Sequence, residues 1–112
     1  MMKPLVYVAG PYTKGDVAMN VRAACAAGER LTEKGLAVFI PHLTHFWHFV
    51  FPHPYEFWLA QDDQILYRCN AVLRLPGESS GADKETATAE RLGIPVFTDE
   101  GDLVAKMSSL VA

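Results

Sequence analysis

Short apolar runs alternate along this chain with longer segments whose apolar residues recur at helical spacing. The apolar runs cover residues 5–9, 36–40, 71–73 and 94–97, lengths typical of buried parallel strands. The helical segments begin near Asp16, Pro54, Ala82 and Asp99. This alternation predicts a single domain over residues 1–112 with an α/β, flavodoxin-like or Rossmann-like fold. We expect a doubly wound parallel sheet of four to five strands, ordered 2-1-3-4, with helices on both faces.

That strand order brings together the loops that follow the first and third strands, the place where open α/β sheets bind ligands. Gly10 and Pro11 follow the first strand, and Ser79, Ser80 and Gly81 lie in the loop after the third. This second loop leads into a helix, whose first backbone N–H groups lack partners and whose dipole favours negative charge. It therefore predicts a site for a phosphate or a carboxylate.

Two carboxylates share the apolar side of their predicted helices. Glu85 lies three residues after Ala82, and Asp62 lies four residues after Trp58, so both point toward the sheet. Asp63 is rotated by about 100° and should face solvent. The alternatives are that Glu85 is a solvated helix residue and that Asp62 only bonds a neighbouring loop.

Tyr7 interrupts the first apolar run with a hydroxyl group. A buried hydroxyl needs a hydrogen-bond partner. Tyr7 is therefore either a core tyrosine bonded to backbone or a residue of a functional site, and the pattern leaves both interpretations open.

The segment from residue 42 to residue 58 differs from the rest of the chain. It holds all four histidines, at positions 42, 45, 48 and 53, and seven of the twelve Phe, Trp and Tyr residues. Histidine spacing of this kind matches none of the recognised metal motifs, so we expect neither a metal nor a cofactor. So much aromatic surface favours a lid, a subunit interface in a homodimer or higher homo-oligomer, or both.

Charge and composition exclude several classes of partner. Ten Lys and Arg residues stand against 13 Asp and Glu, for a net charge of −3 without a basic block, which argues against binding long nucleic acid. No apolar run approaches the roughly 20 residues of a membrane span, and the N-terminus lacks a signal-peptide pattern. We expect a cytoplasmic protein that has no membrane partner and keeps Cys25 and Cys69 reduced in its core.

Taken as a series, the motifs resemble the nucleoside 2-deoxyribosyltransferase superfamily, including its 2'-deoxynucleoside 5'-monophosphate N-glycosidase branch. The matching pieces are residues 6–12, Asp62 placed eight residues before the run 70–72, residues 79–85 and residues 93–96. They follow one another in the family's order and span nearly the whole chain. Asn70 departs from the pattern, because many members have an acidic residue there, and the 42–58 segment has no counterpart that we can place.

The resemblance implies a role for each matching residue. Glu85 corresponds to the nucleophile that attacks the anomeric carbon, and Tyr7 to the hydroxyl that positions it. Asp62 corresponds to the acid that assists departure of the base, while Gly10 and Pro11 correspond to the lining of the base pocket. Carboxylate pairs of this kind suit glycosidic bond cleavage.

Ser79 bears on the choice between branches of the superfamily. Members that act on nucleosides place an Asp six residues before the nucleophile, whereas nucleotide-cleaving members place a Ser, as this chain does. A hydroxyl can donate to a phosphate that a carboxylate repels. We therefore expect hydrolysis of the N-glycosidic bond of a (deoxy)nucleoside 5'-monophosphate. The alternatives are base exchange by a nucleoside 2-deoxyribosyltransferase and a non-catalytic nucleotide-binding module.

Overall fold

The computed structural model describes residues 2–110, which form an α/β fold around one four-stranded parallel sheet. Its strands are β1 (Leu5–Ala9), β2 (Ala37–Phe39), β3 (Ala71–Arg74) and β4 (Val96–Phe97). They pair in the order β2-β1-β3-β4, and every pairing is parallel. The predicted fold class and strand order are confirmed.

Five α-helices and one 3-10 turn surround the sheet over the described residues: α1 (Val17–Glu33), η1 (Pro41–Thr44), α2 (His45–Val50), α3 (Tyr55–Leu66), α4 (Ser80–Arg91) and α5 (Glu100–Ser109). Helices α1, α4 and α5 begin after Asp16, Ser79 and Asp99, whose side chains each accept a hydrogen bond from a backbone N–H three residues later. Helix α2 was not predicted, because its six residues are too few to show helical periodicity.

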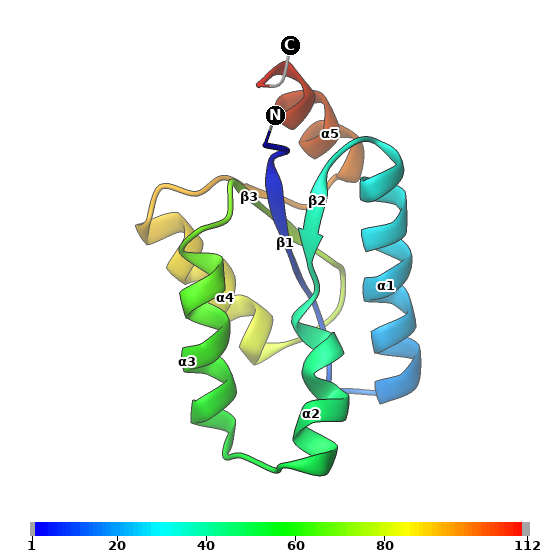
Figure 1. Ribbon diagram of the computed structural model, residues 1–112, viewed down its shortest axis with the longest axis vertical. Helices are drawn as coiled ribbons and strands as arrows, with labels where there is room; N and C mark the ends of the chain where they lie inside the picture. The colour runs from blue at the N-terminus through cyan, green and yellow to red at the C-terminus, as the bar shows by residue number, and fades with distance from the viewer. Residues whose placement is uncertain (1, 111–112) are drawn as a thin grey trace.

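The alternation of side chains along β1 divides the core into two layers. Val6 and Val8 pack with residues of α1 and α5, whereas Tyr7 and Ala9 pack with residues of α3 and α4. Figure 1 shows α1 on one side of the sheet and α3 with α4 on the other. Tyr7 therefore points toward the two helices that carry Asp62 and Glu85.

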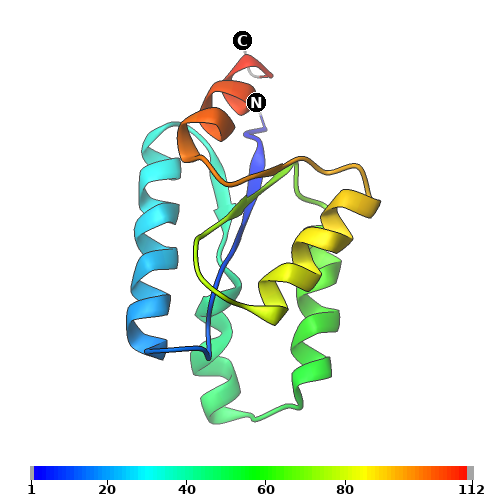
Figure 2. The same ribbon diagram turned by 180° about the vertical axis from the view of Figure 1, so that it is seen from behind.

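The carboxyl ends of the central strands define one end of the molecule. Figures 1 and 2 place α2 and the first turns of α1 and α4 at the end toward which β1 and β3 run. The loops after β1 and β3 meet there, as expected at a topological switch point.

Several predicted boundaries are wrong by one or two residues. The second strand is Ala37–Phe39 instead of 36–40, and the fourth is Val96–Phe97 instead of 94–97. Pro95 has no N–H to pair, although its carbonyl oxygen accepts from the Val72 N–H at 2.9 Å. Pro54 caps α3 rather than beginning it, and α4 starts two residues before Ala82.

The two cysteines differ in burial. Cys69 is a core residue as predicted, and burial raises the pKa of its thiol to about 11. Cys25 is only half-buried on α1, so its assignment to the core is wrong; both thiols are free. Across residues 2–110, no helix combines the length and the apolar character that a membrane crossing needs.

Candidate active site

A cavity of about 540 Å³ lies at the switch point. Its walls come from the loops after β1 and β3, from η1 and α2, and from the facing sides of α3 and α4. Six of the eight predicted site residues line it: Gly10, Asp62, Ser79, Ser80, Gly81 and Glu85. Tyr7 lies behind this lining, fully buried, and Pro11 is also outside it.

Tyr7 and Glu85 meet between the sheet and α4. The Tyr7 hydroxyl donates a hydrogen bond to Oε2 of Glu85, and the two side chains are 0% and 8% exposed. The solvated alternative for Glu85 is therefore wrong, and the partner of the Tyr7 hydroxyl is a side chain rather than backbone. The contact follows from two periodicities, because β1 directs Tyr7 to this face and the helical stripe directs Glu85 back toward it.

Burial makes Glu85 an unusually weak acid. Desolvation raises the pKa of its carboxyl to about 7, and the negative charge of Asp62 adds to the effect, while the hydrogen bond from Tyr7 opposes it. Burial also raises the pKa of Tyr7 far above its ordinary value. Tyr7 thus remains a hydrogen-bond donor at any physiological pH.

Asp62 is the second buried carboxyl group of the cavity. It is 8% exposed, whereas its neighbour Asp63 is exposed, as their positions on α3 predicted. Burial raises the pKa of Asp62 to about 7, and the charge of Asp63 contributes in the same direction. Its Oδ1 atom is buried without a hydrogen-bond partner among the described residues. An orphaned acceptor on a cavity wall is a functional candidate, since a purely structural Asp would be paired.

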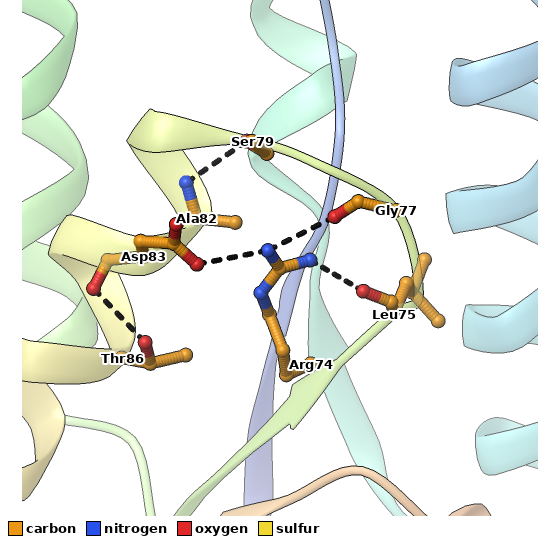
Figure 3. A network of polar contacts seen from close by, with 7 residues as sticks. All are labelled: Arg74, Leu75, Gly77, Ser79, Ala82, Asp83 and Thr86. Carbon is orange, nitrogen blue, oxygen red and sulfur yellow. Dashed lines mark hydrogen bonds and ion pairs between the residues drawn. The ribbon is translucent and has the colours of Figure 1, made fainter.

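The loop after β3 is held in shape by Arg74. Its guanidinium group donates to the carbonyl oxygens of Leu75 and Gly77, at 2.5 and 3.1 Å, and pairs with Asp83 Oδ1 at 3.0 Å (Figure 3). Arg74 therefore ties the loop to the first turn of α4. Ser79 caps that turn, where its Oγ accepts from the Ala82 N–H at 3.1 Å. Its hydroxyl hydrogen remains available to a ligand.

The same loop requires glycine at position 77. Gly77 has a φ of +115°, and a Cβ atom built on it would lie 2.8 Å from Cγ of Pro11. Both facts exclude other residues without rearrangement. Pro11 thus packs against the loop after β3, and its carbonyl oxygen lies 2.9 Å from Nε2 of His42. The structure gives Pro11 a supporting position at the edge of the cavity.

The histidine-rich segment forms one wall of the cavity, a position that the sequence patterns did not predict. His42, His45, His48 and His53 all line the cavity, together with Tyr55 and Trp58. His42 is buried, which lowers its pKa, and its Nδ1 has no hydrogen-bond partner within the described chain. The position of residues 41–44 directly after β2, at the carboxyl edge of a parallel sheet, is the signal that would have placed this segment beside the cavity.

Tyr12 also joins this wall to the loop after β1. The Tyr12 hydroxyl is hydrogen-bonded to Nδ1 of His45, and Tyr12 also packs edge-on against His42. At the mouth, Lys14 pairs with Glu78 at 3.3 Å, although both side chains are largely exposed and such pairs contribute little stability. Across residues 2–110, no three His, Cys, Asp or Glu side chains gather into a group that could hold a metal ion.

Comparison with solved structures supports the fold. A 2-deoxyribosyltransferase of Bacillus psychrosaccharolyticus, described as a biocatalyst for nucleoside synthesis, superposes with a TM-score of 0.66 at 17% identity. The match covers 89% of this chain and 90% of that one. A conserved protein of Enterococcus faecalis V583 gives a TM-score of 0.67 at 17% identity, over 84% of this chain and 61% of that one. No protein of curated function matches the sequence.

These similarities confirm the fold that the sequence resemblance implied, and they show the fold alone. A family model described as "Domain of unknown function (DUF4406)" matches residues 4–98, which is most of the chain and includes the strands, the histidine-rich wall and α4. The chain therefore belongs to the DUF4406 family, and its fold is that of the nucleoside 2-deoxyribosyltransferases.

Proposed function

We propose that this protein hydrolyses the N-glycosidic bond of a (deoxy)nucleoside 5'-monophosphate, releasing the free base and a sugar 5-phosphate. The observation that carries the proposal is the buried Glu85 carboxyl group, held by the Tyr7 hydroxyl at the wall of a cavity that also contains Asp62. A cytoplasmic location, where free nucleotides occur, is part of the proposal.

In the first step, a carboxylate oxygen of Glu85 attacks C1' of the sugar. The C1'–N bond breaks as the C1'–O bond forms, and the base leaves with a proton from the Asp62 carboxyl group. The hydrogen bond from Tyr7 to Oε2 fixes the carboxylate, so that its other oxygen faces the cavity. The product of this step is a glycosyl ester on Glu85.

In the second step, water displaces the Glu85 carboxylate from C1' of the sugar. The Asp62 carboxylate left by the first step takes a proton from a water molecule, whose oxygen attacks C1'. The ester bond to Glu85 breaks, and the sugar 5-phosphate leaves. Glu85 is again a carboxylate and Asp62 is again protonated, so the cycle is closed.

The raised pKa values of Glu85 and Asp62 suit their roles as nucleophile and as acid, respectively. Both carboxyl groups have a pKa of about 7, so near neutral pH the pair readily holds one proton between them. The reactive form has that proton on Asp62 and leaves Glu85 ionised. The hydrogen bond from Tyr7 favours this arrangement, because it lowers the pKa of Glu85 and no such donor reaches Asp62 Oδ1.

The 5'-phosphate is assigned to the loop Ser79-Ser80-Gly81. The loop lines the cavity and begins α4, where unpaired N–H groups and the helix dipole favour an anion. Glu85 lies on the second turn of the same helix. A phosphate at the helix start therefore brings the attached sugar toward the nucleophile.

Base exchange is the second candidate. The fold similarity to a 2-deoxyribosyltransferase favours it, since the two reactions share the glycosyl ester and differ in whether a base or water captures it. A non-catalytic nucleotide-binding module would use the same loop and cavity without forming the ester.

One experiment separates the three candidates. The protein is incubated with nucleoside 5'-monophosphates and with the matching nucleosides, with and without an added acceptor base, and free base is measured by chromatography. Base released from monophosphates alone supports the hydrolase, and exchanged nucleosides support the transferase. Binding without turnover, equal in wild type and Glu85→Gln, supports the binding module. A Glu85→Gln protein that cleaves as fast as wild type contradicts both enzymatic proposals.

Homo-oligomerisation is a further part of the proposal. Five large apolar side chains of η1, α2 and the residue after it are 57–79% exposed and form what we call the α2 patch: Leu43, Phe46, Phe49, Val50 and Phe51. So many exposed large apolar side chains within nine residues of the chain are typical of a subunit interface. Light scattering at micromolar concentration should give at least twice the monomer mass, and Phe46→Ser with Phe49→Ser should reduce it to the monomer value.

A further inference from the structure

His48 stands out among the histidines of the cavity because of what its ring is bonded to. Its Nδ1 atom accepts two hydrogen bonds, from the indole Nε1–H of Trp58 at 2.8 Å and from the backbone N–H of His53 at 3.2 Å. Neither donor can act as an acceptor. Nδ1 therefore carries no proton, and the neutral imidazole has its proton on Nε2.

That Nε2–H group is free to meet a ligand. None of the hydrogen bonds formed between residues 2 and 110 uses Nε2 of His48, and the side chain is half-buried on the cavity wall. The buried polar atoms that lack partners in this part of the chain are Nδ1 of His42 and Oδ1 of Asp62, so Nε2 of His48 is open rather than sealed in the core. Because His48 lines the cavity, this unpaired N–H is the donor that its ring can offer to a ligand there.

The donor is also held rigidly in place. Trp58 packs edge-on against His48, with ring centroids 5.7 Å apart, and against Trp47 at 5.1 Å. His53, which supplies the second N–H, is stacked on Phe57 at 3.7 Å. Since the cluster fixes both groups that bond Nδ1, neither the tautomer nor the ring orientation can adjust easily to a ligand.

The position of Trp58 indicates which part of the substrate His48 meets. Trp58 lies four residues before Asp62 on α3, so the two side chains follow one another on the same face of the helix, and both line the cavity. Under the proposed function, Asp62 gives its proton to the leaving base. With its leaving nitrogen at Asp62, the base extends along α3, so its far edge lies near Trp58 and His48.

We infer that His48 is a specificity-determining residue that donates its Nε2–H to a carbonyl oxygen on the base and so selects oxo-bases over amino-bases. This inference rests on the proposed function. An amino group at the same place would set N–H against N–H and leave a donor unpaired on each side. Sites built around a hydrogen bond reject analogues that lack it strongly, and we expect a preference of roughly tenfold to a hundredfold.

Matched nucleotides whose bases carry either an oxo or an amino group at the same ring position test this selection. Inosine and adenosine 5'-monophosphate differ at the 6-oxygen or 6-amino group, and deoxyuridine and deoxycytidine 5'-monophosphate differ at the 4-position. Wild-type protein should show a higher kcat/KM for the oxo member of the pair that it cleaves faster. No preference, or a preference for the amino member, overturns the inference.

Two substitutions at His48 should abolish the preference in opposite ways. His48→Phe keeps a ring but removes the donor, so kcat/KM for the oxo nucleotide should fall about tenfold or more while that for the amino nucleotide changes little. His48→Gln carries an amide that can present N–H or C=O, so it should accept both nucleotides because the amino member improves. Glu56→Gln, an exposed change on α3, is the control. Variants that keep the wild-type ratio contradict a role for His48.

Binding measurements keep this test separate from the test of catalysis. Glu85→Gln protein should still bind the oxo nucleotide more tightly by calorimetry, and Glu85→Gln with His48→Phe should not. If the wild type binds the oxo nucleotide more tightly but does not cleave it, the proposed hydrolysis is contradicted and the selection by His48 is supported. Absence of binding by all four nucleotides overturns the inference. Ring ¹⁵N chemical shifts give an independent check, since they should report the Nε2–H tautomer, and a proton on Nδ1 contradicts the mechanism.

Discussion

The hydroxyl of Tyr7 donates a hydrogen bond to Oε2 of Glu85, which joins two buried side chains that lie 78 residues apart in the chain. One comes from the central strand β1 and the other from the second turn of α4. The contact gives an otherwise unpaired buried carboxyl group its donor, and it opposes the effect of burial on the pKa of Glu85. It is the structural basis of the first prediction.

Removal of the Tyr7 hydroxyl should weaken Glu85 as a nucleophile. In Tyr7→Phe the pKa of Glu85 loses the contribution that lowers it, so the pKa rises above its present value of about 7. The acidic limb of the kcat/KM profile should move to higher pH, and kcat at neutral pH should fall roughly 10- to 100-fold, as for the loss of one positioning hydrogen bond. An unchanged acidic limb in the variant would show that Tyr7 does not act on Glu85.

Asp62→Asn should affect substrates according to how well their bases leave. Asn cannot give a proton to the base, so kcat for ordinary nucleotides should fall about 100- to 1,000-fold. A nucleotide of 7-methylguanine already has a cationic base, which leaves without a proton from the enzyme, and its cleavage should be much less affected. Rates for the two substrates can be compared by chromatography of the free bases. An equal fall in kcat for both substrates would show that Asp62 does not act as the acid.

Glu85→Gln should stabilise the fold at alkaline pH. The pKa of Glu85 is raised from 4.5 to about 7, so the folded protein binds more protons than the unfolded chain between these values. The contribution of the Glu85 carboxyl group to stability is therefore greatest below pH 4.5, falls as the pH rises through this window, and stays reduced above pH 7. Gln has no charge to bury and can still accept from Tyr7.

The gain in free energy of unfolding should be about 3 kcal/mol at pH 8, from a shift of the pKa from 4.5 to about 7 at about 1.4 kcal/mol per pKa unit. At pH 4.5 it should be much smaller, because the wild-type carboxyl is then largely protonated in the fold. Urea denaturation of both proteins at the two pH values measures the difference. A gain that is independent of pH would mean that the ionisation of Glu85 is not its cause.

Ser79→Asp should separate phosphate binding from helix capping. Asp is as good an N-cap as Ser, so α4 and the thermal stability should be preserved. The new carboxylate repels a phosphate, and the affinity for monophosphates should fall about 100-fold by calorimetry while that for the matching nucleosides changes little. Ser79→Ala is the complementary control, with a loss of about 1 kcal/mol in stability from the missing cap. Equal losses for nucleotides and nucleosides would place the phosphate elsewhere.

The sequence predicted the elements of the fold and part of the site well. The strand order follows from the topology that alternating strands and helices adopt. The inward direction of Asp62 and Glu85 and the exposure of Asp63 follow from local helical periodicity. Position 92 shows the limit of the same reasoning. Leu92 continues the apolar stripe of α4 in sequence, yet at the C-cap of the helix it is 42% exposed, although its backbone is still helical. Periodicity gives the direction of a side chain, whereas its burial also requires a neighbouring element to cover it.

The histidine-rich wall was the main feature that sequence patterns did not place. Helix α2 has six residues, which is too short for a helical period, and its apolar side chains are largely exposed instead of marking a buried face. The interpretation as a lid or an interface therefore rested on composition. The structure assigns the histidines of this segment to the cavity and leaves Phe46, Phe49 and Phe51 on the outside.

The sequence by itself determined which way each side chain of a regular element points, because that depends only on the period of a strand or helix. It therefore predicted that Tyr7, Asp62 and Glu85 face the interior, and their burial in the fold excluded the solvated alternative for Glu85. The tertiary structure decided which of these groups touch and how they ionise. The bond between Tyr7 and Glu85, the raised pKa of both carboxyl groups and the two N–H groups on Nδ1 of His48 all join distant or irregular segments. Burial and partner contacts of this kind exist only once the chain has packed.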